Sequence, residues 1–401
     1  MFGNLNYENR TDKLLQIFLI LFAFTFPLTV FGGNLLLFFI LILWLLRGNI
    51  KDQIQSLPKK KFLLYSILFF IAHVIGLLWT EDLSWGWKIL KKMIDFSIVL
   101  PLLYMSMKRE NSNYYISSFL LSLIFTVFLS YLLYFGFFPK ILHGTIQNPT
   151  PTMSHISYNI YLGFGIYILA HKLLFNREKI NTFLYSSLLI LFTVNMFITE
   201  GRAGHIMFFA ALFLLFLQYF DHRKIRTYVL VFLFVPLFFF LAYNLSDVFK
   251  NRVITTKNNV TKFFKVNDQN TSIGLRFAYA LNTTEVFLEN PMFGVGTGDF
   301  PREYSEVHNK NTPDLPTTVN PHNMYLIVLS QLGIFGFSFF VMMFYYQFKS
   351  SLSTKENFYK NIGVGVVFFY LVIMFSDSYL LGHFTTILYV FLSSIIYRNF
   401  E

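Results

Sequence analysis

The sequence predicts an all-α polytopic membrane protein with about twelve transmembrane helices. Three observations support this fold class. First, 55% of the 401 residues are hydrophobic and only 13% are charged. Second, the apolar residues come in repeated runs of roughly 20, the length of a helix that crosses a bilayer. Third, basic residues gather in alternate connections between these runs, as the positive-inside rule requires of cytoplasmic loops.

The apolar runs define the expected helices in order. They centre near residues 22, 40, 70, 98, 125, 166, 190, 212, 236, 335, 370 and 389. The runs at both ends of the chain are closely spaced, so ten or eleven helices remain possible. The first run, from Lys13 to about Phe31, has no convincing small-residue cleavage site. It is therefore interpreted as a retained helix and not as a signal peptide.

Charge places the loops on the two sides of the membrane. Basic clusters at residues 47–61, 108–109, 172–179, 223–226 and 349–360, with Arg398, mark the cytoplasmic side, and both termini join them. The opposite connections are short, except for a loop over residues 246–321 between the ninth and tenth helices. This long loop is expected to be periplasmic and to contain short helices. No second soluble domain is indicated, so residues 1–401 are expected to form a single membrane domain.

The long loop over residues 246–321 is rich in basic residues, although the positive-inside rule predicts few of them in short periplasmic loops. Long loops escape the positive-inside rule, so the topology is unaffected. The net charge of +11 therefore indicates an anionic substrate such as a lipid-linked diphosphate, and not nucleic acid. A solvated or headgroup-binding surface is the ordinary alternative for most of these side chains. The basic residues of the loop are Lys250, Arg252, Lys257, Lys262, Lys265, Arg276, Arg302 and Lys310.

The most informative stretch is residues 290–337, where a glycine-rich polar loop leads into an apolar helix. Asn320 is expected to cap this helix and Pro321 to lie in its first turn. His322 would then lie at the positive end of the helix dipole, which keeps an imidazole neutral and attracts phosphate.

Two glycines follow on the same expected helix. Gly333 lies eleven residues after His322, about three turns of 3.6 residues, so a regular helix places it beneath His322 with Gly336 beside it. A neighbouring helix or a lipid chain could approach closely there. The earlier run of Gly294, Gly296 and Gly298 resembles a phosphate loop only weakly, because it follows no strand, and a tight turn is expected instead.

Arg202 lies in a minimal loop between two spans, where a charge is costly unless it is paired or functional. Helix parity returns the chain to the same side at His322, so Arg202, Arg276 and His322 can meet at the outer face. Two guanidinium groups would hold a diphosphate, and the imidazole could take a proton from a sugar hydroxyl. The structural alternatives are an interfacial histidine, a headgroup-anchoring arginine and a salt bridge between Arg202 and Glu200.

Absent residue types exclude several chemistries. There is no cysteine and no Asp-x-Asp pair, and the first exported loop, PLTVFGGN, has no carboxylate. These absences argue against metal-dependent transfer from nucleotide sugars and against the lipid-linked glycosyltransferases that place an acid in that first loop. No metal is predicted.

At these residues the chain resembles the O-antigen ligase and O-antigen polymerase superfamily, over about Asn181 to Tyr345. The ligase signature is His, then Asn, Ser or Gln, nine residues, and Gly-x-x-Gly before a small residue or Tyr. This chain has His322, Asn323, Gly333 and Gly336, but Phe337 follows them. That departure leaves the choice between ligase and polymerase open.

The two arginines are similar to family residues by position: Arg202 to the arginine in a short outer loop, and Arg276 to the one that starts a long-loop helix. The resemblance implies a metal-independent, GT-C-like inverting glycosyltransferase without a cofactor, on the periplasmic face of the bacterial inner membrane. It further implies a glycan donor linked to undecaprenyl diphosphate and, for ligases, a lipid A-core acceptor.

Polymerases of the family use a growing glycan as acceptor, and the branch that modifies protein hydroxyls is ranked third. Asn323, Gly333, Gly336, Arg302 and His155 are the candidates for substrate binding beside the three proposed catalytic residues. Membrane lipids are the other expected partners.

A transporter or flippase is the alternative of another class, since it also would have about twelve helices. Its candidate ionisable groups are His73, Asp95 and Asp377, and the last two lie near expected helix ends.

Overall fold

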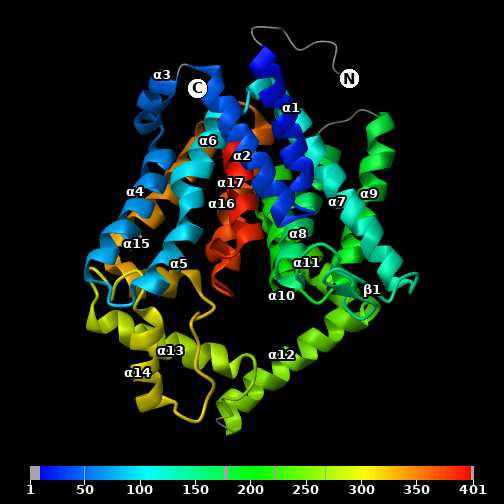
Figure 1. Ribbon diagram of the computed structural model, residues 1–401. Helices are drawn as coiled ribbons and strands as arrows, with labels where there is room; N and C mark the ends of the chain where they lie inside the picture. The colour runs from blue at the N-terminus through cyan, green and yellow to red at the C-terminus, as the bar shows by residue number, and fades with distance from the viewer. Residues whose placement is uncertain (1–9, 49, 176–178, 221–222, 267, 399–401) are drawn as a thin grey trace.

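The computed structural model describes residues 10–48, 50–175, 179–220, 223–266 and 268–398. These residues form a helical bundle with a smaller group of helices at one end (Figure 1). The described chain starts and finishes at the other end, where Asp12 contacts Arg47 at 2.7 Å and Lys108 at 3.6 Å. The all-α class is therefore confirmed.

Helices cover each of the twelve predicted apolar runs. One run is a broken rod made of α5 (Leu83–Ile94), a π-helical turn η3 (Asp95–Val99) and α6 (Leu100–Ser106). The others are α1 (Arg10–Thr25), α2 (Val30–Arg47), α4 (Lys61–Gly76), α7 (Ser112–Tyr134), α8 (His155–Phe175), α9 (Lys179–Ile198), α10 (Arg202–Tyr219), α11 (Ile225–Leu245), α15 (Met324–Ser353), α16 (Asn357–Ile373) and α17 (His383–Ile396).

Short elements fill the connections. They are α3 (Ile50–Ser56), η1 (Leu57–Lys59), η2 (Leu77–Trp79), η4 (Arg109–Asn111), η5 (Tyr379–Leu381) and an antiparallel hairpin of β1 (Lys140–Ile141) and β2 (Gly144–Thr145).

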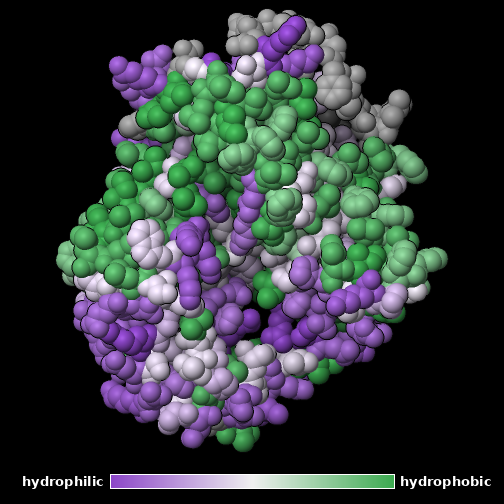
Figure 2. All heavy atoms as spheres, in the orientation of Figure 1, coloured by the Kyte–Doolittle hydropathy of each residue, from purple (hydrophilic) through white to green (hydrophobic). Residues whose placement is uncertain are grey.

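Among the described residues, six helices are long and apolar enough to cross a membrane: α2, α4, α7 with η4, α10, α11 and α15. Large apolar side chains point outward along them; Phe232 on α11, for example, is 79% exposed. Figure 2 shows hydrophobic atoms as a broad band between two hydrophilic ends. These features are those of a polytopic membrane protein, because only lipid makes such a surface favourable. The count of twelve spans remains a prediction.

The core of the bundle surrounds α17, whose residues 385–396 are all buried. Phe391 on this helix packs against Phe22 of α1 and against Phe26 just after α1, and Tyr389 packs against Phe344 of α15. α15 in turn packs along α4. The central helix and α15 therefore hold the two ends of the bundle in a fixed relation.

Residues 246–321 fold mainly into three helices at the end opposite the chain ends (Figure 1): α12 (Asp247–Val266), α13 (Gly274–Glu289) and α14 (Phe300–Asn311). We call this group the cap. The helix expected from residue 274 onward is present as α13. The side of the membrane on which the cap lies, and the domain limits, remain predictions.

The glycine-rich loop before α14 is tied to the bundle. Its backbone pairs with α15 through Val295 N to Ser330 O at 2.9 Å and Gly296 N to Gln331 O at 3.0 Å. Asp299 is buried and accepts bonds from the backbone N–H groups of residues 81 and 82, at 2.8 to 3.1 Å. The loop is thus the tight, structural turn that was expected.

The prediction of a regular helix through Gly333 is wrong. Gly333 has φ 60° and ψ −166°, so α15 is kinked there. The glycine-rich loop bonds to α15 after the kink as well as before it. Ile334 N donates to Pro291 O at 2.8 Å, and Phe335 N donates to Met292 O at 3.1 Å. A Cβ on Gly333 would lie 2.4 Å from the Met292 carbonyl carbon. The close approach is therefore made by this chain's own loop, not by a lipid or another helix.

Candidate active site

The first turn of α15 begins later than expected. Its N-cap is Asn323, whose Oδ1 accepts from the backbone N–H groups of Tyr325 at 3.0 Å and Leu326 at 3.1 Å. The expectation that Asn320 caps the helix is wrong. Asn320 Oδ1 instead accepts from the backbone N–H of His322 at 3.0 Å, and His322 has φ 52°. This left-handed conformation is uncommon outside glycine.

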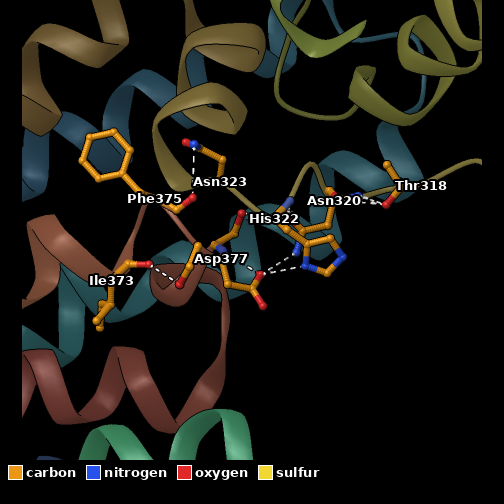
Figure 3. A network of polar contacts seen from close by, with 9 residues as sticks. Thr318, Asn320, His322, Asn323, Ile373, Phe375 and Asp377 are labelled. Atoms are coloured by element: carbon orange, nitrogen blue, oxygen red, sulfur yellow. Dashed lines mark hydrogen bonds and ion pairs between the residues drawn. The ribbon is translucent and has the colours of Figure 1, made fainter. Parts of the chain in front are cut away.

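The His322 ring is held by a carboxylate from a different part of the chain (Figure 3). Nδ1 of His322 lies 3.1 Å from Oδ1 of Asp377, in the turn between α16 and η5. An ionised carboxylate only accepts hydrogen bonds, so Nδ1 carries the proton and Nε2 keeps its lone pair. The side chain of His322 is 36% exposed whereas that of Asp377 is 16% exposed. The imidazole is thus the more accessible member of the pair.

Asp377 is fixed by further donors. Its Oδ1 accepts from the backbone N–H of Ser378 at 2.8 Å and from Asn320 Nδ2 at 3.4 Å. Burial alone would raise the pKa of this carboxyl. The hydrogen bond and charge of His322, the Ser378 N–H and the charge of Arg276 outweigh burial and lower the pKa below its usual value. Asp377 is therefore an anion that orients the imidazole.

The cap closes over the same histidine. The ring of Tyr279 on α13 stacks on His322, with centroids 6.3 Å apart and planes inclined by 25°. Arg276 lies three residues earlier, on the same face of α13. Its charge acts on Asp377 and on Arg202. Within the described part of the chain, Arg276 makes no hydrogen bond or ion pair, so its guanidinium donors remain available.

Arg202 is the first residue of α10, and it faces the start of the cap. Its Nη1 donates to Ser272 Oγ at 3.2 Å, just before α13. The expected alternative of a salt bridge to Glu200 does not form, because Glu200 pairs with Arg252 of α12 at 2.5 Å. The charges of Arg252 and Arg276 both act on Arg202. The three predicted catalytic residues therefore share one electrostatic neighbourhood.

His155 lies at the start of α8, beside this group. Its Nδ1 is 3.1 Å from Asn148 Nδ2, and the charges of Glu200 and Arg252 act on its ring. A Cβ on Gly201 would lie 2.6 Å from the His155 carbonyl oxygen. His155 is thus packed beside Arg202, and its role in substrate binding remains a prediction.

Arg302 is placed differently from the other candidates. Its guanidinium pairs with Glu81, and also with Glu303 at 2.6 Å, on the exposed surface of α14. The hydrogen bonds that Arg302 donates to Glu81 and Glu303 raise the pKa of Arg302, and the one to Glu81 lowers the pKa of that carboxyl. Two carboxylates therefore already satisfy this arginine, which makes a structural link between the cap and residues 80–82 the simpler role.

The remaining candidates have structural contacts. The side-chain Oδ1 of Asn323 caps the N-terminus of α15, and its Nδ2 lies 3.5 Å from Phe375 O. Gly333 is covered by residues 292–293, and a Cβ on Gly336 would lie 2.3 Å from the Leu332 side chain. Their contribution to substrate binding remains a prediction, and these contacts favour a role in shaping the site.

Sequence reasoning missed Asp377 and Tyr279 as partners of His322. Asp377 was weighed only as a transporter group, because 55 residues separate it from His322. Its sequence signal is a carboxylate in the short turn between the last two apolar runs, on the same side as His322 by helix parity. In the described part of the chain, no group of three or more His, Cys, Asp or Glu side chains could hold a metal. That a metal plays no part remains a prediction.

Fold and site together define a polytopic helical membrane protein with a histidine–carboxylate pair and two arginines under a helical cap. Figure 2 shows a hollow edged by hydrophilic atoms below the hydrophobic band, at the end where the cap lies. Residues 187–341 match the family model described as O-antigen ligase. The match runs from α9 into α15, and it indicates an enzyme that transfers glycans. No curated protein matches the chain.

Proposed function

We propose that the chain transfers a glycan from undecaprenyl diphosphate to an acceptor sugar hydroxyl, with lipid A-core as acceptor, on the periplasmic face of the inner membrane. The observation that carries the proposal is the oriented His322–Asp377 pair beside two arginines. The base has a free Nε2, and the arginines supply positive charge where a diphosphate would depart. The family match supports glycan transfer in general.

In this mechanism, Nε2 of His322 takes the proton from the acceptor hydroxyl. The acceptor oxygen forms a bond to the anomeric carbon as the bond from that carbon to the diphosphate oxygen breaks. The electron pair of the broken bond leaves with undecaprenyl diphosphate, and attack from the opposite side inverts the anomeric centre. Asp377 stabilises the imidazolium that forms, and Arg202 and Arg276 stabilise the charge on the diphosphate.

The test is glycan transfer by purified protein in liposomes that contain the lipid-linked donor and an acceptor. His322→Ala is expected to lower kcat by about two to four orders of magnitude while donor binding is retained. Full transfer by His322→Ala would remove the proposed base. Solute flux without glycan transfer would favour a transporter.

A polymerase with the same donor is the second candidate, favoured by Phe337 at the last position of the ligase signature. The site chemistry is the same, and only the acceptor differs. Deletion of the gene separates the two functions. Lipid-linked polymer that accumulates while the core stays bare indicates a ligase, whereas core that bears a single repeat unit indicates a polymerase.

A further inference from the structure

A row of lysines on α5 has no part in the site described above. Lys88, Lys91 and Lys92 are exposed, and at 100° per residue they lie on one face of the helix. The opposite face is buried against the bundle. Its residues are Gly86, Ile89, Leu90 and Met93. We call the first set the lysine face of α5.

The lysine face is unneutralised. None of its three ammonium groups is in an ion pair with a residue that the structure describes; Lys88 lies over the ring of Trp85, 4.9 Å from the centroid. α5 belongs to a rod that also includes η3 and α6 and runs into the apolar band. Charges in such a position are costly unless they face water, headgroups or a ligand. In Figure 2, hydrophilic atoms reach into the hydrophobic band in the region of α5.

The helix that carries the lysine face, α5, lies close to the proposed reaction centre. α5 is fixed to the cap at its start, where Asp299 accepts the backbone N–H groups of Glu81 and Asp82. α5 also contacts η5, which begins two residues after Asp377. Figure 1 shows the turn before α17 between α5 and α10. α10 carries Arg202, so the lysine face and Arg202 belong to different elements at this end of the bundle.

We propose that the lysine face of α5 is the subsite that binds the anionic groups of a phosphorylated glycolipid acceptor. This inference rests on the proposed function. In an inverting displacement the acceptor enters opposite the leaving diphosphate, so it needs a surface separate from Arg202 and Arg276. Three cations within about two helical turns match the charge density of a phosphorylated glycolipid. Charge complementarity of this kind selects one partner over another.

The experiment compares one variant with a charge-matched control. The variant is Lys88→Gln, Lys91→Gln and Lys92→Gln together. The control is Lys51→Gln, Lys349→Gln and Lys355→Gln, which removes three exposed lysines from other parts of the chain. Transfer is measured in phosphatidylcholine vesicles, with a phosphorylated glycolipid acceptor and with the same glycolipid after its phosphates are removed.

With the phosphorylated acceptor, the α5 variant is expected to raise the acceptor KM at least about tenfold, with kcat and the donor KM unchanged. The control should stay within about twofold of the natural protein. With the dephosphorylated acceptor, all three proteins should have similar KM values. A second variant, in which the same three lysines are changed to arginine, is expected to have the acceptor KM of the natural protein. This result would exclude a merely structural effect.

Three outcomes would overturn the proposal. They are an unchanged acceptor KM, an increased donor KM, and an effect that appears only when anionic phospholipid is added, which would assign the lysines to membrane headgroups. Binding of the phosphorylated glycolipid to His322→Ala protein, with and without the α5 changes, is the independent readout. If transfer fails but this binding still depends on the lysines, only the proposed function is wrong.

Discussion

The Nδ1 atom of His322 and the Oδ1 atom of Asp377 lie 3.1 Å apart, although 55 residues and two helices separate them in sequence. The contact fixes which ring nitrogen holds the proton, and so which one can receive another. It also joins the start of α15 to the turn between α16 and η5. A second link between these segments is the hydrogen bond that Ser378 Oγ donates to Asn320 Oδ1 at 2.7 Å. The base and its orienting group thus depend on packing between the last helices.

Asp377→Asn is the first test of this relationship. The amide keeps the shape of the side chain but can present N–H to the ring, which favours the wrong tautomer and removes the negative charge. We expect kcat to fall by about two to four orders of magnitude with the donor KM nearly unchanged. The measurement is steady-state transfer in liposomes.

Asp314→Asn is the matched control for that change, since Asp314 is an exposed acid in the connection between α14 and α15. It should leave kcat unaltered. Equal activity of the Asp377→Asn and natural proteins would show that the carboxylate does not orient the base.

The pH dependence of stability follows from the same carboxyl. The pKa of Asp377 is lower in the folded protein than its ordinary value of about 4. Its stabilising contribution is therefore complete above the unfolded pKa and is lost as pH falls through the folded pKa. We expect the thermal midpoint of the natural protein in detergent to fall more steeply below about pH 4 than that of Asp377→Asn. Parallel curves for the two proteins would contradict the lowered pKa.

Arg202→Lys and Arg276→Lys test the proposed diphosphate site. Lysine keeps the charge but loses the planar fork that binds phosphate at two points. We expect each change to raise the donor KM about tenfold or more, since a charge-assisted hydrogen bond contributes about 1.5–3 kcal/mol. Arg226→Lys, at an exposed position in the first turn of α11, is the control and should have no effect. Donor binding measured by titration of the lipid diphosphate would check the result, and unchanged affinity in both variants would remove the clamp.

The helices could be predicted because lipid leaves the backbone few choices. A run of apolar residues in a bilayer must satisfy its own N–H and C=O groups, so each predicted run coincides with a helix or a broken rod. The kink at Gly333 could not be predicted, because the loop at residues 291–296 imposes it from outside the helix. Local capping rules likewise allowed Asn320 and Asn323 equally, and backbone geometry selected Asn323.

Helix parity predicts which residues of the site lie on the same side of the membrane, but not which of them pair. Parity put Arg202, Arg276 and His322 at one end, and the structure places their charges within reach of one another. Parity says nothing of which acid pairs with which base. Glu200 pairs with Arg252 and not with its sequence neighbour Arg202, and Asp377 pairs with His322. Both pairs form through tertiary contacts, which residue spacing does not predict.

Arg302→Ala separates the two readings of that residue. If Arg302 binds substrate, as predicted from the charge of the loop, the donor KM should rise. The pairing with Glu81 and Glu303 on an exposed surface predicts instead that donor KM stays within about twofold and that the thermal midpoint changes little. Steady-state transfer and thermal unfolding measure both. A large rise in donor KM would restore Arg302 to the binding site.

Gly333→Ala tests whether the kink in α15 is required. Alanine at this position should lower the free energy of unfolding in two ways. It would strain the backbone, because Gly333 has φ 60°, and its Cβ would clash with backbone atoms of Met292 at 2.4 Å. Gly136→Ala is the matched control, because Gly136 also has positive φ, at 76°, but a Cβ there meets nothing within 4 Å. The control should lose about 1–2 kcal/mol from the strained conformation alone. Gly333→Ala should lose clearly more than the control, because backbone cannot move aside as a side chain can. Thermal unfolding of both variants in detergent measures the difference, and equal losses would mean that the loop at Met292 moves aside freely and does not require the kink.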